Sequence, residues 1–275
     1  EAVDELGPER VLSVTLDCGH LRAGELEEIK RHATAAGLTL KVVDKSAEFL
    51  EKIGMIVDSE GTRDVFQKIY ERVAIEEATA FGGKEPAVVL QGTLLPDVIE
   101  SGGTGGAVIK RHHNYGLNLG NLTEVKPLSH LYKDDVRKLA REQGLPESVF
   151  NREPFPGPGG FLRILVPITA ESLAVWRASD STVRGLVRNH EISPKIAQLV
   201  TAIIARAPGV KGDIDVNGYI IAVRPVATTR YMTAKGLHLP VELEDEIIER
   251  VTKHPLVTHC VFDYTPKPPA TIEFK

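Results

Sequence analysis

Lys110, His112 and His113 are three side chains able to carry positive charge, and they lie together in residues 101–121, a stretch rich in glycine and asparagine. Cationic side chains gathered in a loop are suited to neutralising a bound phosphate. A metal site is not predicted there, because the adjacent histidines point in different directions and no carboxylate is close in the sequence. We expect a loop that closes over an anion and excludes water, and a solvated basic loop is the alternative.

Two further groups of polar residues each follow a short apolar run. Asp17 and Gly19 come after the run at 11–16, and Gln91, Gly92 and Thr93 come after the run at 87–90. Both runs have the pattern of a buried strand that stops at a turn. Ligands of parallel sheets bind beyond the carboxyl ends of the strands, so these residues are candidates for ligand binding.

Asp97 and Glu100 follow the second of these groups. Either carboxylate could order the loop at 101–121 or hold magnesium through water. For Asp97, capping the start of a helix is the alternative role. No histidines, cysteines and carboxylates recur at metal-ligand spacing, so no metal ion held by protein ligands alone is predicted.

The expected elements alternate along the first half of the chain, with strands at 11–16, 38–43 and 87–90 and helices at 25–36, 59–81 and 133–143. This alternation predicts an α/β fold with a doubly wound parallel sheet. The Pro- and Gly-rich residues 154–160 can be neither helix nor central strand, and they indicate a stiff hinge. We therefore expect one domain at 1–154 and a smaller α+β domain at 155–275. The second domain is expected to have strands at 161–165, 199–205, 219–226 and 258–264, and helices at 170–189 and 241–253.

Composition limits the class of protein. The chain has 275 residues, of which 42% are apolar, and a formal net charge of -5. A negative charge disfavours binding to nucleic acid through a broad basic face, so the phosphate bound here is expected to be that of a small nucleotide. No apolar run is long enough to cross a membrane and residues 1–10 are unlike a signal peptide, so a cytoplasmic location is expected. Cys18 and Cys260 fit neither a disulfide framework nor a zinc site.

Five segments match the motifs of one family in order and separation. They read LDCGHLR at 16–22, QGTLLPDVIES at 91–101, IKRHHN at 109–114, PFPGPG at 154–159 and KPPATIE at 267–273. They are similar to the motifs V-D-N-G-L-L-R, Q-G-T-x-x-P-D-x-I-E-S, I-K-x-H-H-N, P-F-P-G-P-G and K-P-P-A-T-I-E of the GMP synthetases. The chain thus resembles the ATP-pyrophosphatase and dimerisation parts of that family, in the form of a stand-alone synthetase subunit.

The resemblance implies an adenine nucleotide alpha hydrolase-like domain followed by a dimerisation domain. It also implies the ATP-dependent amination of xanthosine monophosphate (XMP) through an adenylyl intermediate, with release of AMP and pyrophosphate. ATP and Mg2+ are the implied cofactors, and a glutamine amidotransferase subunit that supplies ammonia and a second copy of the chain are the implied partners. Lys110, His112 and His113 would then contact the leaving pyrophosphate. The residues implied to bind ATP are Asp17, Gly19, Gln91, Gly92, Thr93 and Asp97.

Five residues match positions that bind XMP in the family, namely Arg63, Gln198, Asp213, Lys267 and Glu273. Arg63 aligns with an arginine that contacts the substrate phosphate, although from the sequence alone it is a charge on an exposed helix. Two prolines follow Lys267 and hold its backbone extended, which limits the entropy lost on gripping an anion. The alternative for Asp213 is a turn residue, and for Gln198 a polar group at a helix end.

The chain also departs from the family's pattern. The family's S-G-G-V-D-S phosphate loop would fall before Glu1, which leaves the activity of these 275 residues alone open. Cys18 replaces the usual Asn, Glu153 replaces a frequent His, and residues 160–162 replace Leu-Ala-Ile. Two alternatives stay open: a catalytically silent dimerising subunit that retains substrate binding, and another ATP-pyrophosphatase such as an amide synthetase. The motif at 267–273 speaks against the amide synthetase.

Overall fold

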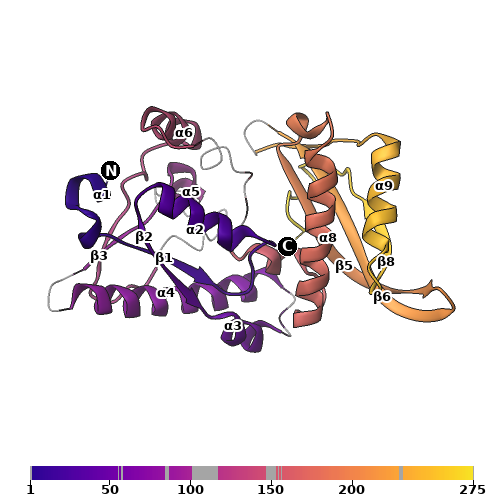
Figure 1. Ribbon diagram of the computed structural model, residues 1–275, viewed down its shortest axis with the longest axis horizontal. Coiled ribbons are helices and arrows are strands. Elements are labelled where there is room, and N and C mark those ends of the chain that lie inside the picture. The colour runs from indigo at the N-terminus through magenta and orange to yellow at the C-terminus, as the bar shows by residue number, and fades with distance from the viewer. Residues whose placement is uncertain are drawn as a thin grey trace. The chain divides into compact units, whose positions relative to one another are not determined.

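The computed structural model describes residues 2–54, 56, 58–83, 87–100, 117–146, 153, 155, 157–228 and 232–274, apart from the side chains of Ser59 and Glu100. The chain divides into two compact units, whose elements are labelled in Figure 1. The first unit consists of Glu1–Asp17, Glu27–Lys45 and Arg63–Arg152, and the second of Cys18–Leu26, Ser46–Thr62 and Glu153–Lys275. The second unit therefore includes two early segments as well as the C-terminal residues, and the domains 1–154 and 155–275 stay a prediction.

Two pairs of parallel strands form the sheets of the first unit. β1 (Leu12–Asp17) pairs with β2 (Thr39–Asp44), and β3 (Val88–Leu90) pairs with β4 (Thr123–Val125). The parallel direction agrees with the expectation from alternating strands and helices. The described strands hydrogen bond as two separate pairs, and a single doubly wound sheet stays a prediction.

The helices of the first unit agree closely with the sequence pattern. Most of α2 (Glu25–Ala35) and α4 (Ser59–Gly82) and all of α6 (Lys133–Glu142) belong to it, and each differs from its expected range by one residue at one end. The elements α1 (Ala2–Leu6), η1 (Pro8–Arg10), α5 (Leu95–Glu100) and β4 were not expected. All four are too short for hydrophobic periodicity to reveal them.

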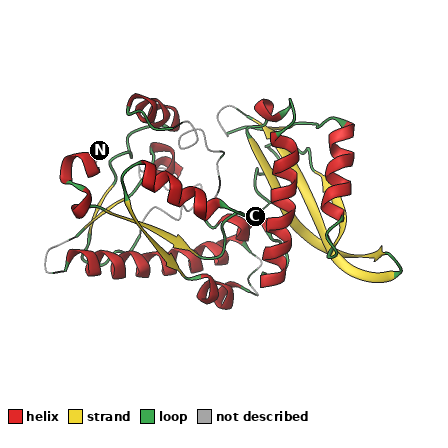
Figure 2. Cartoon of the chain, in the orientation of Figure 1, coloured by secondary structure: helices red, strands yellow, loops and turns green. Residues whose placement is uncertain are grey.

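A four-stranded sheet forms the centre of the second unit. β5 (Gln198–Lys211) and β6 (Ile214–Ala227) form an antiparallel hairpin, β8 (Val257–Phe262) is parallel to β6, and the short β7 (Lys235–Gly236) pairs with the end of β6. The helices α8 (Ala170–Arg188) and α9 (Val241–Thr252) lie side by side along this sheet (Figures 1 and 2). The unit also contains α3 (Ser46–Ile53), η2 (Gly159–Arg163) and η3 (Ser193–Lys195).

The hairpin of β5 and β6 is longer than the sequence indicated. Each strand has 14 residues, whereas strands were expected only at 199–205 and 219–226. The residues between them include a proline and three glycines. These residues favour turns, so the sequence pattern did not indicate that the strands continue. Pairing continues to Lys211 and Ile214 because the two strands are joined by the tight turn at Gly212 and Asp213.

The expected strand at 161–165 is wrong. Residues Gly159–Arg163 form the short 3-10 helix η2, all of it buried, and Ile164 makes a single bridge to Ile203 of β5. A Cβ atom at Gly160 would lie 2.3 Å from the ring of Trp176, so only glycine fits there. The ring of Trp176 on α8 thus sets how closely this segment packs.

The core of the second unit is formed where α3, η2 and α8 meet the sheet. Phe49 stacks on Phe161 with ring centroids 5.2 Å apart, and Trp176 donates from Nε1 to the carbonyl of Thr201 at 2.9 Å. All four of these side chains are fully buried. Among the described helices of the whole chain, none combines the length and the apolar content required to cross a membrane.

Candidate functional site

Two of the residues expected to bind XMP, Gln198 and Glu273, meet at the end of the second unit's sheet where β5 begins, here called the base. Gln198 donates from Nε2 to Glu273 Oε1 at 2.8 Å. Arg163 donates to both oxygens of the same carboxylate, from Nε to Oε2 at 3.0 Å and from Nη2 to Oε1 at 2.9 Å. The side chain of Arg163 is 0% exposed. The fold therefore joins a guanidinium, an amide and a carboxylate from three distant parts of the sequence.

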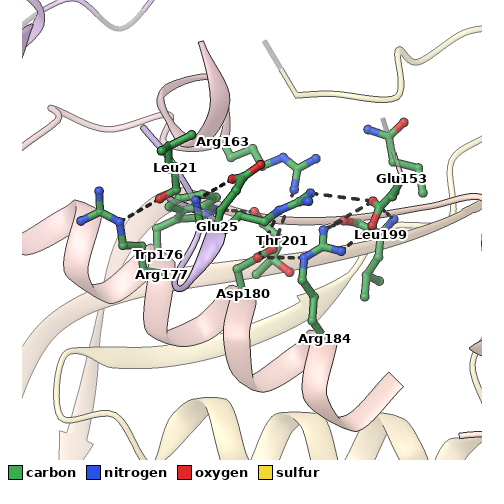
Figure 3. A network of polar contacts seen from close by, with 12 residues as sticks. Leu21, Glu25, Glu153, Arg163, Trp176, Arg177, Asp180, Arg184, Leu199 and Thr201 are labelled. Carbon is green, nitrogen blue, oxygen red and sulfur yellow. Dashed lines mark hydrogen bonds and ion pairs between the residues drawn. The ribbon is translucent and has the colours of Figure 1, made fainter. Parts of the chain in front are cut away.

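Side chains also hold the main chain of the first residues of β5, as Figure 3 shows. Glu153 Oε1 accepts a hydrogen bond from the main-chain N–H of Leu199 at 2.6 Å, and Arg184 Nη2 donates to the carbonyl of Leu199 at 2.6 Å. Arg184 and Glu153 are themselves an ion pair. Both main-chain groups of Leu199 are thus bound by side chains, which fixes the backbone next to Gln198.

Arg22 brings a third guanidinium to the base. It lies 3.9 Å from the ring centroid of Phe155, and its Nη2 lies 3.9 Å from Glu153 Oε1. Burial lowers the pKa of Arg22 to about 10, and the nearby cations Arg184 and Arg163 contribute to this lowering. Burial also acts to lower the pKa of Arg184, but the carboxylates of Asp180 and Glu153 outweigh it and the pKa is raised. Arginine stays protonated in proteins, so the described residues of the base include three cations at neutral pH.

Asp213 does not join this group. It lies with Gly212 in the exposed turn between β5 and β6, where Gly212 has a φ of +63°. Strand residues rise about 3.3 Å each, so the 14 residues of β5 put Asp213 roughly 40 Å from Gln198 in the same chain. Its position is that of the turn residue, the alternative to a substrate ligand.

Lys267 is half-buried in the stretch that follows β8. Its main chain pairs with Ala234 in both directions, with N–H to carbonyl distances of 2.9 and 3.0 Å. Just upstream, Asp263 forms an ion pair with Arg224 and accepts from the N–H of Thr265 at 2.9 Å. These contacts fix the backbone that carries Lys267.

In the first unit, Gln91, Gly92 and Thr93 follow β3 as expected. The main-chain N–H of Gln91 donates to the carbonyl of Val125 on β4 at 3.0 Å, and the side chains of Gln91 and Thr93 are buried. Among the described residues, the buried Nε2 of Gln91 has no hydrogen-bond partner, and apart from the two chain neighbours of Gly92 none has an atom within 4 Å of a Cβ built on that glycine. A buried unsatisfied donor beside an open glycine, beyond the ends of parallel strands, fits a ligand site.

The remaining residues expected at the ATP site have identifiable main-chain or capping contacts. Asp97 is the third residue of α5 and accepts from the N–H of Leu94 at 3.0 Å, so it caps the start of the helix from within its first turn and is not the N-cap residue. Asp17 ends β1, and its carbonyl accepts from the N–H of Lys45 at 2.7 Å. In the second unit, the carbonyl of Gly19 accepts from Arg177.

Arg63, on α4, is half-buried, so its expected exposure is wrong. Lys110, His112 and His113 lie outside the described residues, and their assignment stays a prediction. Within the described part of the chain, no three His, Cys, Asp or Glu side chains are grouped so that they could hold a metal ion. Mg2+ keeps several waters and commonly binds through phosphates and one or two carboxylates, so Mg2+ that arrives with a nucleotide needs no such group.

Three ionic residues of the base, Arg22, Asp180 and Arg184, were not singled out from the sequence. A signal was present for Asp180, which falls on the buried apolar stripe of α8 formed by Leu173, Trp176, Val183 and Val187. A carboxylate on the apolar face of a helix must be paired, and Arg184 lies one turn further on. The same pattern could have predicted the pair of Asp180 and Arg184, which is the part of the network that lies on one helix.

Comparisons with known proteins match a family over the C-terminal part of the chain and relatives over most of its length. Residues 186–274 match the family described as GMP synthase C terminal domain. The chain is 40% identical over 275 residues to a protein of Methanococcus maripaludis that is named as a subunit of glutamine-hydrolyzing GMP synthase, and the match covers 97% of this chain and 85% of that protein. It is 40% identical to the glutamine-hydrolyzing GMP synthase of Thermus thermophilus, over 96% of this chain and 53% of that protein. For the GMP synthase of Mycobacterium bovis the identity is 41%, over 97% of this chain and 52% of that protein.

Proposed function

The chain belongs to the GMP synthase family, and on that premise we propose that it carries out the ATP-dependent amination of XMP to GMP. In this reaction O2 of XMP attacks the α-phosphorus of ATP, pyrophosphate leaves, and ammonia then displaces AMP from C2. The observation that supports the proposal most is the buried grouping of Arg163, Gln198 and Glu273 at the base. Two of these three residues lie within the matched region 186–274.

The side chains at the base of the sheet can recognise a purine ligand that carries N–H donors and carbonyl acceptors. The carboxylate of Glu273 accepts hydrogen bonds, and the amide of Gln198 both donates and accepts. Arg163 and Gln198 already orient the carboxylate in the free protein. Less side-chain freedom is then lost when a ligand binds, which favours affinity.

Lys267 and Arg63 are proposed to bring positive charge to the phosphate of XMP, because charge-assisted contacts to phosphate are among the stronger hydrogen bonds. Asp213 is not included in the site at the base, given its place in the exposed turn. A homodimer is also proposed. Val210 and Ile214 beside that turn are 67% and 69% exposed, and apolar surface of this kind favours association.

ATP is proposed to bind at the residues that follow β3, where Gln91 offers a buried donor and Gly92 leaves room for close approach. Mg2+ bound with ATP would supply charge neutralisation for the leaving pyrophosphate. The chain's own part is to bind and orient the nucleotide through Gln91, Gly92 and Thr93. Lys110, His112 and His113 are proposed to contact the pyrophosphate. Ammonia is proposed to come from a glutamine amidotransferase partner, and the cytoplasm stays the expected location.

Release of AMP and pyrophosphate, measured with XMP, ATP, Mg2+ and ammonium, tests this function. The proposal predicts equal amounts of AMP, pyrophosphate and GMP, with release dependent on XMP. Calorimetry should show XMP binding that Glu273→Gln weakens and Glu171→Gln, on the exposed side of α8, leaves unchanged. XMP binding without AMP release would identify the silent dimerising subunit instead, and ATP binding with no XMP binding would contradict the proposal.

A further inference from the structure

Asp180 is a carboxylate buried in the middle of α8. Its side chain is 2% exposed, and its neighbours along the same stripe, Trp176 and Val183, are fully buried. An ionised carboxylate in such surroundings is strongly unfavourable unless it is paired. The partners of Asp180 therefore have to account for its presence.

The two carboxylate oxygens of Asp180 face different arginines, and Figure 3 shows Asp180 between Arg163 and Arg184. Oδ2 accepts from Arg184 Nε at 2.8 Å and lies 3.5 Å from Arg22 Nε. Oδ1 lies 3.7 Å from Arg163 Nη1. Neither Oδ1 nor Nη1 has a hydrogen-bond partner in the described part of the chain, so this contact depends on charge and on position.

Arg163 contacts one residue proposed to bind XMP, and Arg184 contacts the chain neighbour of another. Arg163 uses its Nε and Nη2, on the far side of the guanidinium from Asp180, to bind both oxygens of Glu273. Arg184 uses its Nη2 to bind the carbonyl of Leu199, the residue after Gln198. One buried carboxylate thus contacts both of the side chains that set the geometry of the base.

Charge balance makes the arrangement sensitive to this one group. Among the described residues, three guanidiniums face three carboxylates, and the six residues form the ion cluster of Arg22, Glu153, Arg163, Asp180, Arg184 and Glu273. Removing the charge of Asp180 leaves an excess positive charge, and Arg22, Arg163 and Arg184 then compete for Glu153 and Glu273. The carboxylate of Glu273 would be pulled further into the cluster and away from a ligand.

We propose that Asp180 is a positioning residue for XMP, one that acts through Arg163 on Glu273 and through Arg184 on the start of β5. Asp180 itself does not touch the substrate. The inference rests on the proposed function, since it takes Gln198 and Glu273 as substrate ligands. It adds a residue outside the matched region 186–274 to those that determine substrate affinity.

Asp180→Asn keeps the shape of the side chain and removes its charge, so XMP binding to this variant is the first measurement. Calorimetric titration should show an XMP dissociation constant raised about 10- to 100-fold, the range expected when a charge-assisted contact is lost. ATP affinity should fall much less, because Gln91, Gly92 and Thr93 belong to the first unit. In steady-state assays the KM for XMP should rise more than kcat falls. Glu171→Gln, on the same helix but in an exposed ion pair with Arg206, should stay within about twofold of wild type.

A double-mutant cycle separates positioning from a purely structural role. If Asp180 acts through Glu273, Asp180→Asn should weaken XMP binding much less when Glu273 is already Gln. If the two substitutions raise the XMP dissociation constant by factors that simply multiply in the double variant, the proposal is overturned. Asp180→Asn/Arg184→Gln keeps the cluster neutral and guards against loss of folding, which the near-ultraviolet circular dichroism of Trp176 reports. A folded Asp180→Asn variant that binds XMP like wild type would also overturn it. Failure of the wild-type chain to bind XMP would instead contradict the proposed function, and the inference would fall with it.

Discussion

The two ends of β5 carry residues that the family motifs treat alike but that the fold places in opposite surroundings. At the base, Gln198 is 5% exposed and binds Glu273, and the next residue is held by Arg184 and Glu153. At the turn, Asp213 is exposed and follows a glycine with positive φ. Burial and convergent partners distinguish the base from the exposed turn within one chain. The assignment of Gln198 to XMP gains support from its surroundings, and that of Asp213 stays a prediction.

Arg163→Ala should have the largest effect on the base, because it removes the buried guanidinium that binds both oxygens of Glu273 and faces Oδ1 of Asp180. Removing one member of a buried ion pair costs about 3 to 5 kcal/mol of unfolding free energy. Urea unfolding followed by the fluorescence of Trp176, the one tryptophan of the sequence, measures it. Asp213→Asn is the matched control at the turn and should change the free energy by less than about 0.5 kcal/mol. Equal losses of unfolding free energy in Arg163→Ala and Asp213→Asn would contradict the difference between the two ends of β5.

Lys267→Ala tests whether the stretch after β8 belongs with the base. Loss of a charge-assisted hydrogen bond should weaken XMP binding by about 1.5 to 3 kcal/mol and leave ATP binding largely unchanged. Calorimetry with each ligand separates the two effects. Equal weakening of both would contradict the assignment of Lys267 to XMP.

Gly212→Ala probes the other end of β5. Gly212 has a φ of +63°, and a left-handed conformation costs a residue with a Cβ about 1 to 2 kcal/mol. The expected result is a lower free energy of unfolding with unchanged XMP affinity. Weaker XMP binding in this variant would show that the turn takes part in the site.

Asp263→Asn provides a pH-dependent test of the backbone that carries Lys267. Burial acts to raise the pKa of Asp263, but the hydrogen bonds from Thr265 and the charge of Arg224 outweigh it, and the pKa is lowered. A lowered pKa in the folded state adds stability above the unfolded value of about 3.9, and this stability is lost as the pH falls through the folded value. At pH 7 the variant should be less stable by about 1 kcal/mol. The difference should shrink on acidification below about pH 4, and a difference that stays constant with pH would contradict this role.

The sequence predicted much of this fold, and its errors have local physical causes. Long amphipathic helices such as α4 and α8 and buried strands such as β1 show clear periodicity, so their ranges were predicted within two residues. The strand expected at 161–165 failed because the ring of Trp176, which is distant in sequence, decides the conformation of Gly160. The part of the β5–β6 hairpin next to its turn was missed because its proline and three glycines are residues typical of loops.

The candidate site was predicted in part. Gln198 and Glu273 came from motif matches, and the fold brings them together. The ion cluster that orients them was missed, because its members come from five separate segments and no spacing in the sequence relates Arg22 or Glu153 to Asp180. Only the carboxylate on the apolar stripe of α8 gave a local sign of the network.

An XMP titration of the wild-type chain beside Glu273→Gln and Asp213→Asn is the most direct test of the difference between the two ends of β5. Wild type and Asp213→Asn should bind XMP with the same dissociation constant. Glu273→Gln should raise that constant about 10-fold or more, because it removes the charged acceptor at the base. A larger loss of affinity in Asp213→Asn than in Glu273→Gln would show that the substrate site is not at the base.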